Sequence, residues 1–92
     1  MGIFDKLKNL NEMRKEAKQL QGQMAQVVIS GDSSGGKVKL VMDGNFEVKS
    51  VEVDVSIAGD KSEVARHVRA ALEDLFKNYK KAMQKRFGGM MQ

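Results

Sequence analysis

The densest group of chemically active side chains in the sequence is a run of cations near the C-terminus. Five Lys or Arg residues and no acid occur within ten residues: Lys77, Lys80, Lys81, Lys85 and Arg86. Spacings of three and four residues place most of them on adjacent rows of a helix. Cations stabilise a helix C-terminus, but one or two suffice, and like charges four residues apart repel. The cluster therefore indicates contacts to phosphates, where counterion release offsets the repulsion.

The remaining charges are segregated along the chain. Residues 1–26 carry five Lys or Arg against three acids, residues 27–60 carry three against six, and residues 61–92 carry eight against three. Both ends are basic, which favours a polyanion as the partner, although a solvated helix surface explains part of the pattern. The N-terminal candidates for phosphate contact are Lys8, Arg14, Lys15 and Lys18.

Residues 31–37, GDSSGGK, have the spacing of a phosphate-binding loop, G-x-x-x-x-G-K. That motif needs Ser or Thr next, and a helix whose N-terminus faces the phosphates. Here Val38 follows, and the pattern beyond it is that of a strand. We interpret the segment as a hairpin loop.

Neither catalysis nor metal binding is expected. The chain has no Cys and one histidine, His67, which predicts a surface or partly packed side chain rather than a ligand. Since the serines cluster in predicted loops, no nucleophile–base arrangement can be built, and we expect no cofactor, metal or small-molecule substrate. No apolar run reaches the roughly 20 residues of a membrane span. The chain is expected to be soluble and cytoplasmic.

The central element that must position these groups is a β-hairpin over residues 36–54. Apolar and polar residues alternate on both sides of Asp43-Gly44-Asn45, which suits a three-residue turn. The predicted pairs are Met42 with Phe46, Leu40 with Val48, and Val38 with Ser50. The apolar positions then shift phase at Val51, which predicts a β-bulge near Ser50. A lone hairpin is only marginally stable in water, so its apolar face must be covered.

A long helix is predicted before and after the sheet. The first runs from about Phe4 to Ala25, with this apolar stripe at helical spacing: Ile3, Leu7, Leu10, Met13, Ala17, Leu20 and Met24. Residues 27–29 read as a first strand. The last helix starts near Asp60, capped by Asp60 or by Ser62, and ends at Gly88-Gly89.

The predicted fold class is therefore α+β. The order is α-β-β-β-α, a three-stranded antiparallel sheet flanked by two long helices. It forms one domain over residues 1–92: helix 1–26, sheet 27–55, helix 60–87 and a frayed tail 88–92 that includes Met90 and Met91. With five aromatic residues and no Trp, its core is expected to be aliphatic and methionine-filled.

The last helix is expected to outreach its sheet. About 27 residues span about 40 Å as a helix, whereas a strand of seven or eight residues spans about 25 Å. Tyr79 and Met83 would then extend beyond the sheet and need a partner. A second copy of the chain is the simplest one, which predicts a homodimer with two-fold symmetry.

This pattern resembles the YbaB/EbfC family of small bacterial nucleoid-associated DNA-binding proteins. The resemblance rests on the Met/Gln/Lys-rich segment 13–24, the Gly-rich loop before GKVKLVMDG, the VEVD segment 51–54 and the basic last helix with its Gly- and Met-containing tail. It covers nearly the whole chain, and order and spacing carry it rather than any single motif. The family often has Pro after the VEVD-like aspartate, where this chain has Val55. The resemblance implies a tweezer-like homodimer with protruding helical arms that binds duplex DNA with little sequence preference.

These observations together predict a protein without enzymatic activity that binds double-stranded DNA in the nucleoid. Affinity is expected to come from Lys and Arg contacts to phosphates rather than from base readout. The alternative is a protein-interaction module that uses its long amphipathic helices. A membrane-surface helix is a weaker option, because the apolar stripes lack Trp and are needed for the core.

Overall fold

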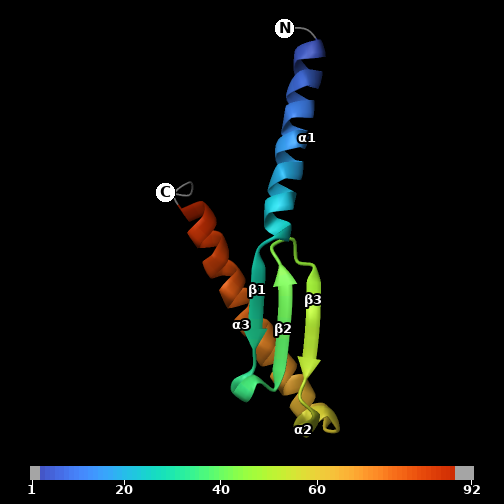
Figure 1. Ribbon diagram of the computed structural model, residues 1–92, viewed down its shortest axis with the longest axis vertical. Coiled ribbons are helices and arrows are strands. Elements are labelled where there is room, and N and C mark those ends of the chain that lie inside the picture. The colour runs from blue at the N-terminus through green and yellow to red at the C-terminus, as the bar shows by residue number, and fades with distance from the viewer. Residues whose placement is uncertain (1–2, 89–92) are drawn as a thin grey trace.

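A computed structural model describes residues 3–88, and side chains from residue 9 onward (Figure 1). The elements are α1 (Ile3–Ala25), β1 (Val28–Asp32), the 3₁₀ turn η1 (Ser34–Gly36), β2 (Val38–Asp43), β3 (Val48–Val53), α2 (Val55–Ala58) and α3 (Lys61–Phe87). The strands form one antiparallel sheet in the order β1-β2-β3. The predicted α+β order is confirmed, with one added short helix. Of the predicted frayed tail, all but Gly88 lies outside the described residues.

β1 is longer than predicted, because Gly31 and Asp32 continue the strand instead of opening a loop. Gly31 pairs with Leu40 of β2. A Cβ on Gly31 would lie 2.4 Å from the backbone oxygen of Ala71 in α3. This glycine therefore permits a close approach of helix and strand, and it is not a turn residue.

The predicted register of the β2–β3 hairpin was wrong. Met42 pairs with Val48, Leu40 with Val51, and Val38 with Val53. The predicted bulge is confirmed, because Val41 pairs with Ser50 while Met42 pairs with Val48, which leaves Lys49 as the extra residue.

The cause of the shift is a wider turn than the three residues predicted. The Asp43 carboxylate Oδ1 accepts hydrogen bonds from the backbone N–H groups of Asn45 (2.8 Å) and Glu47 (3.0 Å). Phe46 adopts a left-handed backbone conformation with φ of 65°, which is rare for a bulky residue. The turn therefore includes Phe46 and Glu47, and β3 begins only at Val48.

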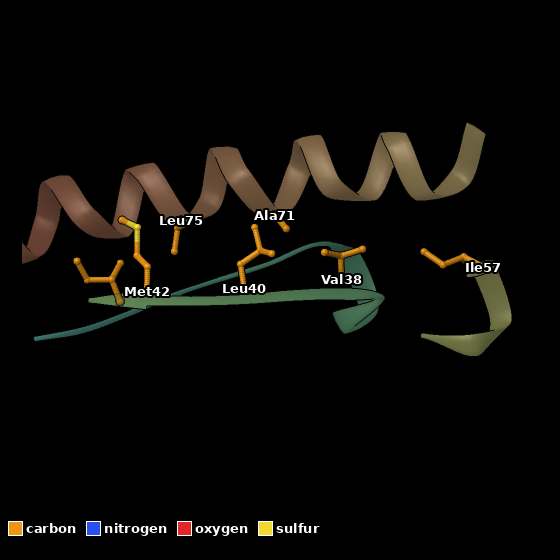
Figure 2. Close-up of a cluster of buried hydrophobic side chains, with 7 residues drawn as sticks. Val38, Leu40, Met42, Ile57, Ala71 and Leu75 are labelled. Carbon is orange, nitrogen blue, oxygen red and sulfur yellow. The ribbon is translucent and has the colours of Figure 1, made fainter. Parts of the chain in front are cut away.

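The hydrophobic core lies between the sheet and α3 (Figure 2). α3 packs on β1 and β2. The buried cluster contains Ile29, Val38, Leu40, Met42, Ile57, Ala71 and Leu75. As expected from the composition, the cluster is aliphatic with one methionine.

The exit from the sheet differs from the prediction. β3 ends at Val53, two residues early, and α2 begins at Val55, where the Asp54 side chain accepts a hydrogen bond from the Ser56 N–H (2.8 Å). α2 turns Ile57 into the core, while Val55 is exposed. The short helix thus closes the lower end of the core in Figure 1.

α3 begins with an Asp cap. The Asp60 carboxylate accepts hydrogen bonds from the N–H groups of Ser62 and Glu63, which selects Asp60 over Ser62 as the capping residue. The expectation that Tyr79 and Met83 lie beyond the reach of the hairpin was wrong. Both pack against the core cluster, because α3 crosses the sheet and the wide hairpin turn brings Phe46 against Tyr79, with ring centroids 4.7 Å apart.

α1 projects from the domain as an arm. Figure 1 shows it leaving the end of the sheet at which the C-terminal end of α3 also emerges. The radius of gyration is 18.9 Å and the extents are 65 × 27 × 19 Å, whereas a compact chain of this length would have a radius near 12 Å. Among the described residues, α3 is the helix that packs across the sheet. The molecule is therefore a small α+β head with two diverging helical ends.

Candidate nucleic-acid interface

Hydrogen bonds to the free edge of β1 set the rotation of α3 about its axis. The Asp32 backbone N–H donates to Asp74 Oδ2 (2.9 Å), and Asn78 Nδ2 donates to the Ser30 carbonyl oxygen (2.8 Å). These side chains occupy groups that an edge strand would otherwise offer to another strand. The flank of α3 that carries Asp74 and Asn78 therefore faces the outer edge of β1.

The predicted lysine cluster follows this flank toward the C-terminus. Lys77, Lys81 and Lys85 lie four residues apart and continue the rows of Asp74 and Asn78. All three are exposed, and we call them the basic flank. Lys80, also exposed, belongs to the side of α3 that faces away from the sheet. Arg86 is separate from both, because it lines a hollow between α3 and α1 together with Gln19 and Gln23.

The cations of the C-terminal half of α3 are available to a ligand. Within residues 9–88, the Lys and Arg ion pairs of α3 lie in its N-terminal half, where Arg66 meets Glu63 (2.7 Å) and Arg69 meets Glu73 (3.2 Å). None of the five predicted contact residues takes part in an ion pair within that range. Lys49, in the bulge, is instead held by Asp43 and Glu47, at 3.7 and 3.3 Å.

The N-terminal candidates lie on the projecting arm. Arg14, Lys15 and Lys18 are exposed on α1. Lys8 is also part of α1, but its side chain lies outside the described residues. Glu12 and Glu16 alternate with these cations, so α1 is less basic than the end of α3. The structure thus places the candidates on two diverging helices at one end of the molecule.

Another surface was not predicted from the sequence. β3 pairs with β2 so that Val48, Val51 and Val53 point to the same side as the core residues opposite them. β3 lies beyond the strands that α3 covers, and these three valines are exposed. Leu72 and Phe76, on the flank of α3 opposite Asp74, are exposed as well. We call these five residues the open apolar face.

The structure also assembles a serine, a histidine and a carboxylate, which the sequence analysis had excluded. His67 Nδ1 lies 2.8 Å from Ser33 Oγ, and His67 Nε2 lies 3.7 Å from Glu63 Oε2. Ser33 is only 5% exposed, and its oxygen accepts the Val38 N–H (2.9 Å). A buried hydroxyl occupied in this way cannot reach a substrate. The three residues instead tie α3 to the turn between β1 and β2.

The segment that resembles a phosphate-binding loop has another structure. Its first residues belong to β1, Ser34–Gly36 form η1, and β2 follows at Val38. The Lys37 ammonium group donates a hydrogen bond to Ser56 Oγ (2.9 Å). No helix N-terminus follows Lys37, so the interpretation as a connecting turn is confirmed for its second half.

Asp43, at the end of β2, and Asp54, directly after β3, are held as carboxylates. Burial raises the pKa of Asp43, but the hydrogen bonds from Glu47 and Asn45 and the charge of Lys49 outweigh it and lower that pKa below the ordinary value. Hydrogen bonds from Ser56 lower the pKa of Asp54. Asp43 Oδ2 is buried without a hydrogen-bond partner. These carboxylates organise turns, and residues 9–88 hold no group of three His, Cys, Asp or Glu that could bind a metal.

Among the described residues, none of the helices combines the length and the hydropathy that crossing a bilayer requires.

Comparison with known proteins places the chain among relatives. The sequence profile described as the YbaB/EbfC DNA-binding family matches residues 1–92. The chain is 32% identical over 90 residues to a nucleoid-associated protein of Hahella chejuensis, covering 89% of this chain and 83% of that one. It is 37% identical over 89 residues to a nucleoid-associated protein of Koribacter versatilis, covering 90% and 88%. An uncharacterized protein of Helicobacter pylori shares the fold, with a TM-score of 0.75, 24% identity and coverage of 100% and 99%.

Proposed function

The chain belongs to the YbaB/EbfC DNA-binding family, and we propose that it binds double-stranded DNA in the nucleoid, as a homodimer and without catalysis. The observation that carries the proposal is the set of exposed cations without ion pairs on the described C-terminal half of α3, whereas Arg66 and Arg69 in the N-terminal half of the same helix are paired. The nucleoid-associated names of two relatives support it.

Binding would rest on phosphates rather than bases. The basic flank, Lys80 and Arg86 present point charges and flexible stems on the outside of a helix, and α1 adds Arg14, Lys15 and Lys18. Such contacts position a protein on DNA but carry no sequence information. Unrelated duplexes should therefore bind within a few-fold of one another. Affinity should fall steeply with salt, with a log–log slope of about −0.9 for each phosphate neutralised.

The DNA-binding proposal is tested by removing charge from the basic flank. Replacing Lys77, Lys81 and Lys85 with Gln keeps length and helix propensity. The matched control removes the same charge from the N-terminal half of the same helix, by replacing Lys61, Arg66 and Arg69 with Gln. The first variant should lose affinity for all duplexes alike, and its salt slope should shrink by about one per lost contact. The control variant should keep its DNA affinity and its salt slope closer to the parent values.

The outcome that overturns the proposal is equally specific. A folded basic-flank variant that binds duplex DNA like the parent would exclude this flank. If the control lost as much affinity, net charge rather than a defined surface would explain binding. A salt-insensitive interaction of fixed stoichiometry with another protein would favour the interaction-module alternative.

The homodimer would form through the open apolar face. One half of this face belongs to a strand and the other half to a helix, so a two-fold axis can place Leu72 and Phe76 of one chain on Val51 and Val53 of its partner. Each sheet would then be covered by two helices, and apolar area would be buried at about 25 cal/mol per Å². Val51→Lys should give a folded monomer by sedimentation at concentrations where the parent is a dimer. Glu52→Lys, on the other side of β3, is the control, and a dimeric Val51→Lys would refute this interface.

A further inference from the structure

α1 carries an apolar stripe that the described residues of its own chain leave exposed. Leu10, Met13 and Leu20 are 49%, 63% and 44% exposed, and Ala17 between them is exposed too. Their steps of three and four residues are those of a helix that packs against another helix. An isolated helix is marginal in water, so a long arm is stabilised mainly by packing of its apolar face.

The α3 helix of the same chain faces a different side of the arm. The hollow between α1 and the end of α3 is lined by Gln19, Gly22, Gln23, Gln26 and Arg86. At 3.6 residues per turn, Gly22 and Gln26 lie on the side of α1 opposite the stripe. The stripe therefore points away from its own α3, and Figure 1 shows the two helices diverging as they leave the sheet.

A second copy supplies the complementary surface. On α3, Phe76, Met83 and Phe87 continue one flank from the open apolar face toward the C-terminus at steps of seven and four residues. In the proposed dimer, this flank covers the partner's β3. Beyond the sheet, the end of α3 leans away from its own α1 and, after a two-fold rotation, toward the α1 stripe of the other protomer.

The lengths of the two helices match at this point. The Met24 carbonyl oxygen accepts a hydrogen bond from the Gly44 N–H (2.8 Å), and the Tyr79 ring contacts the ring of Phe46. Gly44 and Phe46 belong to the same hairpin turn, so Met24 of α1 and Tyr79 of α3 lie at the same height along the molecule. Leu20 and Met83 each lie four residues farther out, about 6 Å along their helices at 1.5 Å per residue. Rotation about a two-fold axis parallel to the arms leaves the height of each residue along that axis unchanged. Leu20 of one protomer would therefore lie beside Met83 of the other.

We propose that each DNA-contacting arm is a two-chain structure, in which α1 of one protomer packs antiparallel against the C-terminal end of α3 of the other. This inference rests on the proposed homodimer. It places Arg14 and Lys18 of one protomer on the same arm as the basic flank of the other, so that one arm would present cations of both protomers to phosphates. The binding surface would then be incomplete in a monomer.

The test uses single cysteines, since the chain has none of its own. Leu20→Cys and Met83→Cys are refolded together, to allow subunit exchange, and oxidised. A disulfide requires Cα atoms about 4.4–6.8 Å apart. The expected result is a Leu20→Cys/Met83→Cys cross-linked dimer as the main product of the mixture, and its loss when either variant is oxidised alone. Gln19→Cys, on the polar side of α1, is the matched control and should not cross-link to Met83→Cys.

Other outcomes overturn the two-chain arm. Cross-linking of Leu20→Cys to itself would show that α1 pairs with α1. An uncross-linked mixture that still sediments as a dimer would show that the arms are separate. Sedimentation of the parent and of each variant separates this failure from failure of the dimer itself. DNA binding of the reduced variants reports on the proposed function independently, and circular dichroism checks that both variants keep their helices.

Discussion

The close approach of Gly31 and α3 allows a sharp test of the packing. A Cβ on Gly31 would lie 2.4 Å from the Ala71 oxygen, 2.5 Å from the Leu75 nitrogen and 2.6 Å from the Leu75 Cα. All three atoms belong to the helix backbone, which cannot rotate away as the end of a long side chain can. Gly31→Ala must therefore push α3 away from β1 along the centre of the core.

The magnitude follows from two opposing effects. Replacing a strand glycine with alanine normally stabilises by about 0.5–1 kcal/mol, because the unfolded chain loses freedom. Overpacking a core costs about 1–3 kcal/mol, and contacts to backbone belong at the upper end of that range. We expect the free energy of unfolding to fall by about 2 kcal/mol. In a domain of this size, each kcal/mol lowers Tm by about 4–8 °C.

The assay is urea and thermal unfolding at a fixed protein concentration, because any self-association makes the apparent stability concentration-dependent. Gly59→Ala is the matched control. Apart from Gly59 itself and its two chain neighbours, the described residues place no heavy atom within 4 Å of the added Cβ, and φ is −85°, so the stability of this variant should stay within about 0.5 kcal/mol of the parent. If Gly31→Ala were as stable as Gly59→Ala, α3 would not pack on β1 as described.

Two further predictions concern polar groups beside the core. Because the pKa of Asp43 is lowered in the folded state, its carboxylate stabilises the fold above about pH 4, the unfolded value, and this contribution is lost as the pH falls through the folded pKa. Asp43→Asn keeps the Oδ1 acceptor, so this variant should lose less stability below that pH in acid titrations followed by circular dichroism. An acid profile identical to that of the parent would contradict the stabilising role of the Asp43 carboxylate. Ser33→Ala leaves the buried Val38 N–H without its partner and should cost about 1–3 kcal/mol in urea unfolding. The exposed neighbour provides the comparison, since Ser34→Ala should change stability by less than about 0.5 kcal/mol, and equal losses would refute the role of the buried hydroxyl.

Local patterns were enough to locate the main elements and the candidate cations. Apolar residues at steps of three and four marked both long helices, and alternation marked β2. A cap at Asp60 or Ser62 and a bulge near Ser50 also followed from neighbouring residues, because capping and phase shifts depend on a few adjacent positions. The cluster from Lys77 to Arg86 was visible as composition alone.

The partners of those elements could not be predicted in the same way. Gly31 reads as a loop residue until α3 is known to pass within contact of it. Val51 and Val53 alternate like core residues, yet they are exposed because α3 covers only β1 and β2. Ile57 joined the core because Asp54 starts a short helix between the predicted sheet, residues 27–55, and the predicted last helix, residues 60–87.

The sequence by itself therefore determined the order of helix, sheet and helix, the aliphatic character of the core and the basic ends of the chain, since these depend on periodicity, side-chain volume and charge. Only the tertiary structure decided the hairpin register, the rotation of α3 and the direction of α1. These depend on hydrogen bonds between residues far apart in the chain, such as Asn78 with Ser30, and on backbone contacts that a single glycine permits. The rotation of α3 separates the basic flank from the open apolar face, because Asp74 and Asn78 bind the edge of β1 and turn the opposite flank of the helix toward β3.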